Sequence, residues 1–520
     1  MKRILHALQN RFVLLLFSAF LSALPMTVPS LFFLSWFSFV PFFFVLGSAG
    51  GEGKFRSALG RGVFFGFFYH IFIYFWFWWL YSLEFTGMEK SAALGVVLLA
   101  WCGISLVHGA LYAIPTVLCH FFARFVKSRP FLLCVGAFGI LASQRMTELS
   151  QLAFPWVRVS LGQYRAPALI QSASLFGMEG LDLLILSVNV LLALLLFYKA
   201  KKRLLCASFA VALFLSNLAF GFVSLARANK GETVTVSSVQ GCILSGEKWN
   251  GAQTAFDTYV SMTRECPDET ELVVWPESAV PVNLATDPSL VSFYQELSEE
   301  VDSSILMGCF WKEQGITTNS AILLSPEAVS EPYHKKILVP FGERMPYRKW
   351  LSRLVPALGQ INMLKNDLAP GTSTSLMDYS DRRIGAVICF DSIFPSVVRQ
   401  SAKDGAELFV IVTNDSWYED SPAVWQHLAH AVFRSVENGR STVRCANSGV
   451  SAFIDEKGRV QSQLGPLEKG VLTDSVSFCE NKTLYTAVGN VCFPVFGAAL
   501  ALWFCILAGR EGLLCRKKKN

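Results

Sequence analysis

Charged residues are scarce in this 520-residue chain: Asp, Glu, Lys and Arg together make up 16%, against about 25% in an average soluble protein. Hydrophobic residues account for 52%, and 44 residues are Phe. This composition excludes an ordinary soluble protein and favours one that enters a membrane. The formal net charge is +6, but aromatic and basic residues do not alternate as they do on a nucleic-acid-binding surface. We therefore expect no nucleic-acid partner.

The sequence also lacks the usual patterns of disulfide and metal sites. It has 13 cysteines, an odd number, with no CxxC pair, so we expect mostly free thiols. It has no HExxH motif and no Cys/His cluster. His427 and His430, three residues apart in WQHLAH, fit one face of a helix better than a metal site. We expect no metal and no cofactor.

Long apolar runs fill the first 228 residues. Each is close to the ~20 residues that cross about 30 Å of hydrocarbon. We predict spans at 10–26, 30–49, 59–81, 91–118, 130–146, 176–198 and 204–226, and an eighth at 484–508. Because further spans follow the first at once, we interpret the first as an uncleaved signal anchor.

Basic residues between these spans predict their orientation. If the spans alternate in direction, most of the clusters fall on one side, which is then cytoplasmic. The gap after the fifth span, with Arg145, Arg158 and Arg165, does not fit this pattern. The orientation places residue 230 outside the cytoplasm and returns the C-terminal tail to it. The clusters are Lys2 and Arg3; Lys54, Arg56 and Arg61; Arg124, Lys127 and Arg129; Lys199, Lys201, Lys202 and Arg203; and Arg516, Lys517, Lys518 and Lys519.

Residues 230–480 differ in character from the rest of the chain. Charges are frequent there, and short apolar runs such as TVTVSSVQ, ELVVWPE, SILMGCF, AVICF and ELFVIVTND alternate with amphipathic helical patterns at 287–302 and 423–438. This alternation predicts an α/β domain. We therefore divide the chain into a membrane domain (1–229), a catalytic domain (230–480) and a last span with a basic tail (481–520).

Three motifs in the α/β region carry reactive side chains at or after strand ends. VVWPESAVP contains Glu277, YHKKILVPFGERMP contains Lys335 and Glu343, and VICFDSIFP contains Cys389. Functional groups of open α/β folds gather at the carboxyl ends of strands. A carboxylate can accept the thiol proton, and an ammonium can stabilise the thiolate and a later oxyanion, helped by the backbone N–H of Phe390. The set predicts a thioester acyl-enzyme.

Taken together, WPES, YHKKILVPFGE and VICFD resemble the three motif blocks of the nitrilase (carbon–nitrogen hydrolase) superfamily, and TNDSW (413–417) and RCANSGVSAFID (444–455) match further blocks. The resemblance implies an αββα sandwich. It also implies that Glu277 is the general base, Lys335 the oxyanion and thiolate stabiliser, and Cys389 the nucleophile. Glu343 is similar to the additional active-site carboxylate of the family.

The whole chain looks more narrowly like the apolipoprotein N-acyltransferase family, because LVPFGE, NDSW and, outside the α/β region, FPWVRVSLGQ (154–163) are close to its forms. Two positions depart from the family's usual Tyr-Glu after the cysteine: Phe390 lacks the hydroxyl, and Asp391 keeps the charge on a shorter arm. Trp249, in EKWN, corresponds either to a substrate-adjacent tryptophan of the family or to a partly buried aromatic at a helix start.

This resemblance implies that the protein moves a fatty acyl chain from a membrane phospholipid, through a Cys389 thioester, to the α-amino group of diacylglyceryl-cysteine in an apolipoprotein. It also implies a multi-pass protein in a bacterial inner membrane, about eight transmembrane helices, a catalytic domain that faces the periplasm, and a monomer in the lipid bilayer.

Three other readings of the sequence stay open at this point. A membrane-anchored amidase that hydrolyses a small C–N substrate would use the same three residues, although it would not need eight spans. A transporter or channel with an inert outer domain is the second, but the spans carry few ionisable residues besides His70 and His108. A non-catalytic nitrilase-like binding module is the third, but such a module typically lacks one of the three residues, and all three are present here.

Overall fold

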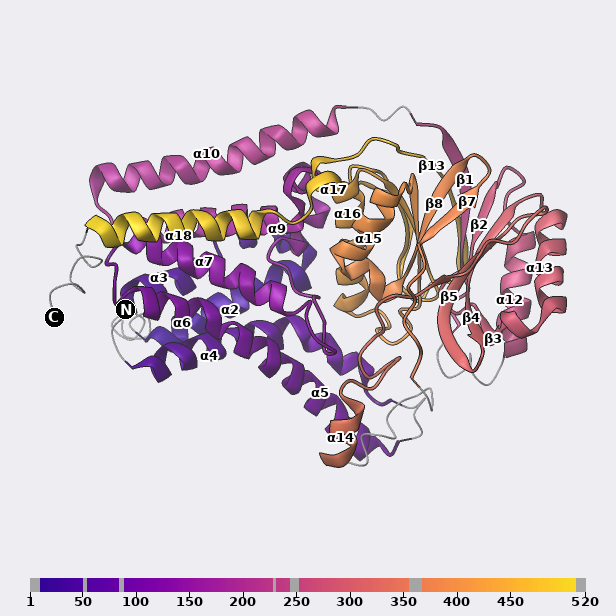
Figure 1. The fold of residues 1–520 in the computed structure, drawn as a ribbon, viewed down its shortest axis with the longest axis horizontal. Helices are drawn as coiled ribbons and strands as arrows, with labels where there is room; N and C mark the ends of the chain where they lie inside the picture. The colour runs from indigo at the N-terminus through magenta and orange to yellow at the C-terminus, as the bar shows by residue number, and fades with distance from the viewer. Residues whose placement is uncertain are drawn as a thin grey trace.

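The computed structural model describes residues 10–49, 54–83, 88–227, 231–243, 252–354 and 367–510. A bundle of helices forms one end of the molecule and a β-sheet domain the other (Figure 1). This arrangement confirms the predicted fold class, a helical membrane bundle joined to an α/β sandwich. Trp249 and the basic residues at both chain ends lie outside the described residues.

A helix is found at each of the eight predicted spans. Among the described residues, six helical segments are long and apolar enough to cross a membrane: 29–49, 55–80, 90–122, 173–194, 200–225 and 492–510. The other two predicted spans are a shorter apolar helix, α2, and the 18-residue helix α7. The bounds are α2 Arg11–Thr27, η1 Pro29–Trp36, α3 Val40–Ala49, α4 Phe55–Ile73, η2 Tyr74–Leu80, α5 Lys90–Leu111, α6 Ala113–Phe122, α7 Arg129–Met146, η4 Leu161–Arg165, α8 Pro167–Ile170, α9 Ala173–Leu194, α10 Ala200–Leu225 and α18 Cys492–Arg510.

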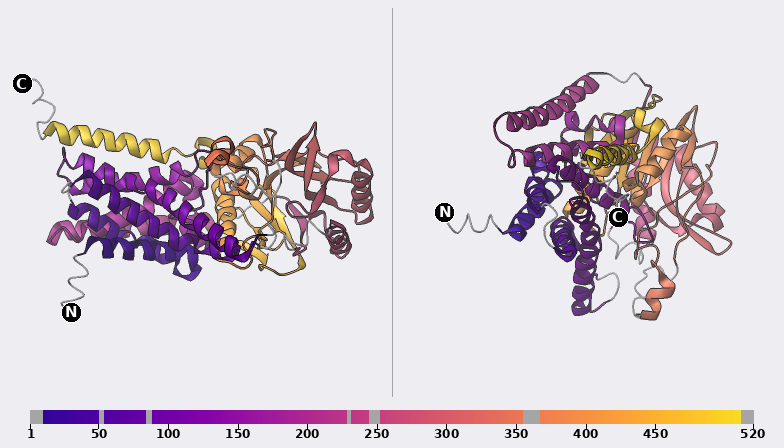
Figure 2. Two further views of the ribbon diagram at one scale, coloured as in Figure 1. Left: turned by 90° about the horizontal axis from the view of Figure 1, so that it is seen from below. Right: turned by 60° about the vertical axis from the view of Figure 1, so that its left-hand side comes forward.

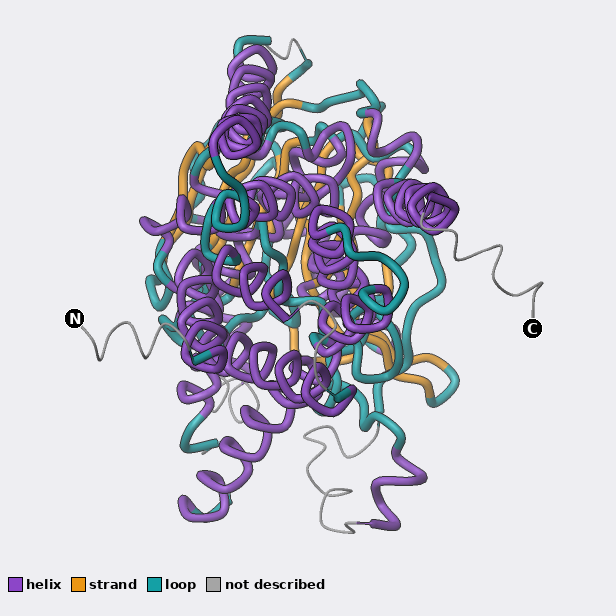
Figure 3. Tube along the Cα trace, turned by 90° about the vertical axis from the view of Figure 1, so that its left-hand side faces the viewer, coloured by secondary structure: helices purple, strands orange, loops and turns teal. Residues whose placement is uncertain are grey.

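Close helix packing within the bundle depends on small residues. A Cβ on Gly66 of α4 would lie 2.8 Å from the Cα of Gly109 in α5, so the two backbones can touch only where neither residue has a side chain. Large aromatic side chains fill the spaces on either side, among them Phe65, Tyr69 and Tyr112, which are buried. Figure 3 looks at the end of the bundle and shows its helices in front of the strands.

The α/β region consists of two sheets. The first has the order β13-β1-β2-β4-β5-β6, with β3 paired to β4, and the second has the order β12-β11-β10-β9-β8-β7. The strands are β1 Thr233–Gln240, β2 Leu272–Val274, β3 Val280–Asn283, β4 Ser304–Glu313, β5 Ile316–Leu324, β6 Tyr333–His334, β7 Leu376–Tyr379, β8 Arg382–Ile388, β9 Leu408–Thr413, β10 Ser441–Ala446, β11 Ser451–Ile454, β12 Val460–Leu464 and β13 Gly470–Ser477.

Two layers of helices cover the outer faces of these sheets, which gives the αββα sandwich (Figure 1). Apolar residues of both sheets, such as Val236 and Val274 from one and Ile388 and Val410 from the other, share one core. The helices are α12 Ala252–Arg264 and α13 Pro288–Glu300 on the first sheet, and α15 Pro395–Asp404 and α16 Pro422–Asn438 on the second; α14 Arg348–Leu354, α17 Leu484–Val488, η5 Leu284–Thr286 and η7 Cys389–Ile393 lie between strands or near the bundle.

Helix α16 confirms the helix predicted at 423–438, and its polar face is buried as well as its apolar face. Every residue from Gln426 to Asn438 is buried, because the polar face of α16 packs against the membrane bundle. Gln426 accepts a hydrogen bond from Trp156 Nε1 (2.6 Å) and donates one to the carbonyl of Met26 (3.1 Å). The two halves therefore form one packed body, which Figure 2 shows from two further sides.

Candidate active site

Glu277 and Cys389 lie just beyond the carboxyl ends of two strands, one in each sheet. Glu277 follows β2, and Gly308 of β4 leaves room for its backbone: a Cβ on Gly308 would lie 2.6 Å from the Cα of Glu277. Cys389 follows β8 directly and has a φ of 48°, in the left-handed region that a non-glycine residue rarely adopts. Such strained turns after a strand present a nucleophile above its neighbours.

Lys335 joins two carboxylates at the centre of the site. It follows β6, its side chain is 1% exposed, and its Nζ lies 2.9 Å from Glu277 Oε1 and 2.9 Å from Glu343 Oε1. Asn319, in β5, donates hydrogen bonds to the same two oxygens at 2.7 and 2.8 Å. The second oxygen of Glu277 accepts from the backbone N–H of Asn414 (2.8 Å), so both carboxylates are held in one orientation.

Cys389 reaches this cluster through Glu277. Glu277 and Lys335 are both close enough to the Cys389 thiol to act on its pKa. The residue as a whole is partly exposed, unlike Cys309 and Cys445 of the same domain, which are buried. The structure therefore brings Glu277, Lys335, Glu343 and Cys389 together, as the sequence motifs suggest.

Burial and neighbouring charges set the resting protonation states. Burial raises the pKa of Cys389 well above its usual value, and the Glu277 charge raises it further while Lys335 opposes both. Burial alone would raise the pKa of Glu277, but the charge and hydrogen bonds of Lys335 lower it in net. Burial alone would lower the pKa of Lys335, but the two carboxylates raise it well above its usual value. The site at rest thus holds a neutral thiol beside a carboxylate and an ammonium ion.

Comparison with known proteins identifies both halves of the chain. Residues 235–479 match the model of the carbon-nitrogen hydrolase family, and residues 18–191 match that of the apolipoprotein N-acyltransferase N-terminal domain. An apolipoprotein N-acyltransferase of Geobacter metallireducens is 32% identical over 65% of this chain and 67% of its own, and one of Chlorobaculum tepidum is 30% identical over 66% and 71%. The chain belongs to the apolipoprotein N-acyltransferase family. Among solved structures, Saccharomyces cerevisiae Nit3, of the nitrilase superfamily, is 19% identical and covers 48% of this chain and 93% of its own at a TM-score of 0.38.

Asp391, which departs from the usual Glu of the apolipoprotein N-acyltransferases, has contacts that position the neighbouring Lys335. Its carboxylate accepts hydrogen bonds from Tyr333 Oη (2.7 Å) and from the backbone N–H groups of Ile337 (2.7 Å) and Lys336 (3.2 Å). Asp391 is buried, and burial raises its pKa to about 6 against the opposing charge of Lys335. The shorter arm of Asp391 therefore still reaches the segment that carries Lys335.

Phe390, the other departure, contacts the membrane bundle with its ring. It stacks on Phe154 at 5.8 Å between ring centroids, and Phe154 stacks on Trp156 at 5.2 Å. Both partners belong to the FPWVRVSLGQ segment. A continuous aromatic wall thus connects the residue after Cys389 to the bundle, and this contact does not require the missing hydroxyl.

A second buried ion cluster supports the turn at Cys389, and sequence reasoning did not assign its members. Asp415 accepts from Arg444 (2.7 Å) and lies 2.9 Å from His427 Nδ1. Nε2 of His427 in turn faces the Ser392 hydroxyl (3.0 Å) and the Cys389 carbonyl (3.3 Å). Asn414 and Asp415 follow β9, so the strand-end argument could have selected them. His427 lies on α16, as predicted, and both of its ring nitrogens take part in these contacts.

Proposed function

We propose that this protein is a phospholipid-dependent apolipoprotein N-acyltransferase whose acyl carrier is Cys389. The observation that carries the proposal is the close grouping of Cys389 with Glu277 and Lys335, the last two of which are 2.9 Å apart. The acceptor is the α-amino group of diacylglyceryl-cysteine at the N-terminus of an apolipoprotein. The related proteins named above carry this activity in their names, and family membership favours it over hydrolysis of a small amide.

The first half-reaction forms the thioester. Glu277 takes the thiol proton as the sulfur attacks the carbonyl carbon of a phospholipid ester. The Lys335 ammonium and the backbone N–H of Phe390 stabilise the oxyanion; the latter has no acceptor inside η7 because it lies in its first turn. The ester C–O bond then breaks, and Glu277 returns the proton to the leaving alcohol, which departs as lysophospholipid.

The second half-reaction transfers the chain to nitrogen. The neutral α-amino group attacks the thioester carbon, and Glu277 accepts a proton from the attacking nitrogen. The C–S bond breaks, and the proton passes to the sulfur, which restores the thiol and leaves an N-acylated lipoprotein. Lys335 keeps its proton throughout, because its two carboxylate partners hold its pKa high.

The surroundings of the thiol favour transfer over hydrolysis. A thioester open to water would hydrolyse, so a transferase must exclude water from it. The aromatic wall of Phe390, Phe154 and Trp156 lies on the bundle side of Cys389, and Trp76 of η2 extends it by packing 5.6 Å from Trp156. These side chains, all buried or half-buried, exclude water from the bundle side of Cys389.

The proposed orientation of the protein in the membrane follows from the basic residues of the bundle. The catalytic unit (230–480) faces the periplasm of a bacterial inner membrane, between the membrane domain (1–229) and the last span with its tail (481–520). Helix α10, whose N-cap is Lys199, begins at the bundle end away from the sheets (Figure 1), which supports a cytoplasmic location for that end. We propose that the protein acts as a monomer.

The test is acyl labelling of the cysteine. Full-length protein in detergent is incubated with phospholipid that carries a labelled acyl chain, and the protein-bound label is measured before and after hydroxylamine, which cleaves thioesters. We expect label on the wild type and on Cys505→Ala, an exposed cysteine of α18, and none on Cys389→Ala. A labelled thioester on Cys389→Ala would exclude Cys389 as the carrier. Release of ammonia from small amides at a rate above acyl transfer would favour the amidase instead.

A further inference from the structure

The bundle end opposite the catalytic domain is cationic and, within the described ranges, without salt bridges. The described acidic residues of the bundle are Glu89, Glu148, Glu179 and Asp182, and the two that form salt bridges, Glu179 and Glu148, pair with Arg145 and Arg158. None of the described cations at the opposite end forms a salt bridge with a described acid. These cations are Arg11, Lys54, Arg56, Arg61, Arg124, Lys127, Arg129, Lys199, Lys201, Lys202, Arg203 and Arg510.

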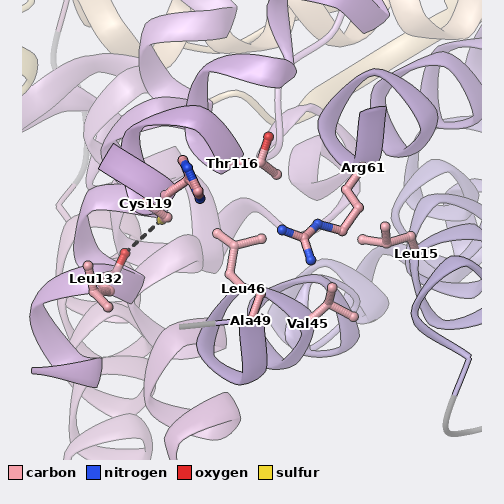
Figure 4. A pocket seen from close by; sticks show the side chains of 9 residues that line it. Leu15, Val45, Leu46, Ala49, Arg61, Thr116, Cys119 and Leu132 are labelled. Atoms are coloured by element: carbon pink, nitrogen blue, oxygen red, sulfur yellow. Dashed lines mark hydrogen bonds between the residues drawn. The ribbon is translucent and has the colours of Figure 1, made fainter. Parts of the chain in front are cut away.

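A pocket opens between helices α2, α3, α4, α6 and α7 at this end. Its enclosed space is about 20 Å³, enough for a water-sized group, and it continues into an open mouth. Apolar side chains such as Leu15, Leu46 and Leu132 form its walls, and its polar lining includes Arg61 and His120. Figure 4 shows the Arg61 guanidinium extending from α4 toward the middle of the ring of lining side chains.

Arg61 is a buried cation with no acid or carbonyl to hold it among the residues the structure describes. Only 6% of the residue is exposed, and no hydrogen bond or salt bridge joins it to a described residue. A charge of the same sign, that of Arg11, is close enough to interact with Arg61 electrostatically. An uncompensated buried cation is costly, so an anion in the pocket would be strongly stabilised.

His120 supplies a second hydrogen-bond donor without an acceptor. It is 5% exposed, and its Nε2 lies 3.0 Å from the Arg124 guanidinium. A guanidinium group can only donate, so Nε2 accepts and the proton of the neutral ring is on Nδ1. This Nδ1–H is buried and, among described atoms, has no partner. The pocket thus presents two sets of donors and apolar walls, which is the pattern of a site for an amphiphilic anion.

We propose that this pocket binds the phosphate group of an anionic phospholipid from the leaflet at that end of the bundle. Phosphate oxygens enter the narrow pocket and accept from the guanidinium of Arg61 and Nδ1–H of His120, and the rest of the lipid stays outside at the mouth. Basic pockets between transmembrane helices are suited to such head groups. An anionic lipid is favoured over a zwitterionic one because a choline or ethanolamine cation would meet Arg11 and Arg124 there with no described carboxylate.

This lipid is distinct from the acyl donor. β8, which leads to Cys389, lies at the other end of the molecule (Figure 1). A lipid at Arg61 therefore cannot present its ester to the sulfur. We assign it a supporting role, in which it neutralises Arg61 and joins α4 to α6. The inference needs only that the bundle spans a membrane, and it stands whether or not Cys389 carries an acyl chain.

Native mass spectrometry of the full-length protein tests the proposal. Phosphatidylglycerol, phosphatidylcholine or inorganic phosphate is titrated into the wild type, Arg61→Gln and Arg56→Gln. Arg56 is the matched control, since it is an exposed arginine in the first turn of the same helix. We expect phosphatidylglycerol to bind the wild type in preference to the other two ligands. Arg61→Gln should weaken this binding at least about tenfold, as expected for a lost charge-assisted contact, and Arg56→Gln less than about twofold.

Other outcomes would overturn the proposal. Equal weakening by the two variants would mean that diffuse surface charge binds the lipid. Equal affinity for phosphatidylcholine would exclude an anionic lipid, and competition by inorganic phosphate at equal concentration would indicate a site for a free anion.

His120→Ala is a second variant, with an expected weakening of phosphatidylglycerol binding of about threefold to tenfold. Glu52 lies outside the described residues. If Arg61→Gln and Glu52→Gln lower the lipid-free Tm equally, the partner of Arg61 is a carboxylate of the chain and the proposal fails.

Discussion

Lys335 and Arg61 are both buried cations, but their surroundings differ. Lys335 has two carboxylates at 2.9 Å and an amide that bridges them, whereas Arg61 has no partner among the described residues and faces a pocket. Burial of a charge is tolerated when partners compensate for it. In the catalytic domain, carboxylates of the chain itself neutralise the buried cation, and their fixed positions suit a catalytic role. In the bundle, we infer, the membrane supplies the anion.

The comparison also explains where precision is needed. A nucleophile and its base must stay within hydrogen-bond distance, so Glu277 and Glu343 are fixed by Lys335, Asn319 and backbone N–H groups. A lipid site needs only charge and apolar walls, since the ligand can adjust its own position. The pocket at Arg61 accordingly lacks such a network within the described residues.

The largest expected effect is that of removing Lys335. Lys335→Ala leaves Glu277 and Glu343 facing each other without a cation, so thioester formation should fall by about three orders of magnitude or more. The same change should lower the free energy of unfolding by about 3–5 kcal/mol, because two carboxylates lose their partner. Single-turnover acylation and chemical denaturation measure the two quantities.

Lys336→Ala is the control for this variant, because Lys336 is the adjacent ammonium and takes part in no described salt bridge. Its rate and stability should stay close to those of the wild type. Near-normal turnover of Lys335→Ala would remove Lys335 from the mechanism.

Removal of the Glu277 charge is expected to cause the next largest loss in the rate of thioester formation. In Glu277→Gln, the side chain keeps its size but cannot take the thiol proton, and thioester formation should slow by about 10²–10⁴-fold. Phospholipid binding, measured by retention of a non-hydrolysable ether lipid, should change little. A large loss of binding with an unchanged acylation step would assign Glu277 to substrate binding instead.

Asp415→Asn tests whether the carboxylate that neutralises the buried Arg444 also stabilises the turn at Cys389. Without the Asp415 charge, the fully buried Arg444 guanidinium has no carboxylate partner. This change should lower the free energy of unfolding by about 3–5 kcal/mol. Burial alone would raise the pKa of Asp415, but Arg444 and His427 lower it well below its usual value. This contribution is therefore complete above about pH 3.9, the unfolded pKa, and is lost as the pH falls toward the folded pKa.

The surface pair Arg264–Glu300 is the counterpart for that measurement. Its side chains are 48% and 49% exposed at a distance of 2.6 Å, so Arg264→Ala should leave the denaturation midpoint without measurable change. Equal losses from the two variants would contradict the view that burial decides the value of these pairs.

Asp391→Asn should have the smallest effect on rate, about tenfold, because Asn can still accept from one of the two backbone N–H groups. The wild-type rate should fall as the pH drops through about 6, the pKa to which burial raises Asp391, since protonation removes an acceptor from the segment of Lys335. Asp391→Asn should lack this step in the pH–rate profile. A profile identical to that of the wild type would assign the step to another group.

The sequence predicted much of this structure because strand and span patterns are local. TVTVSSVQ is β1 from its first to its last residue, and the helix expected at 287–302 is α13, Pro288–Glu300. Glu277, Lys335 and Cys389 follow short strands, where such residues meet by topology alone. Asn319 gave no such signal, since it lies inside β5 and its role depends on β5 passing between two carboxylates.

The sequence patterns did not predict contacts between segments far apart in the chain. The pattern at 423–438 predicts a helix but not the burial of its polar face, which depends on the docking of the bundle. Similarly, Arg61 was one basic residue among several that oriented the spans, and its burial depends on how α4 packs against α6. Helix breaks inside spans, such as the 3₁₀ segments η1 and η2, depend on the same packing.

The central claim is that the sulfur of Cys389 carries the fatty chain between donor and acceptor. Peptide mass spectrometry of the full-length protein, after exposure to phospholipid without acceptor, tests it most directly. The account predicts the added mass of one acyl chain on the Cys389 peptide, lost again when a diacylglyceryl-peptide is added. An unmodified Cys389 peptide in a preparation that still N-acylates the acceptor would contradict it.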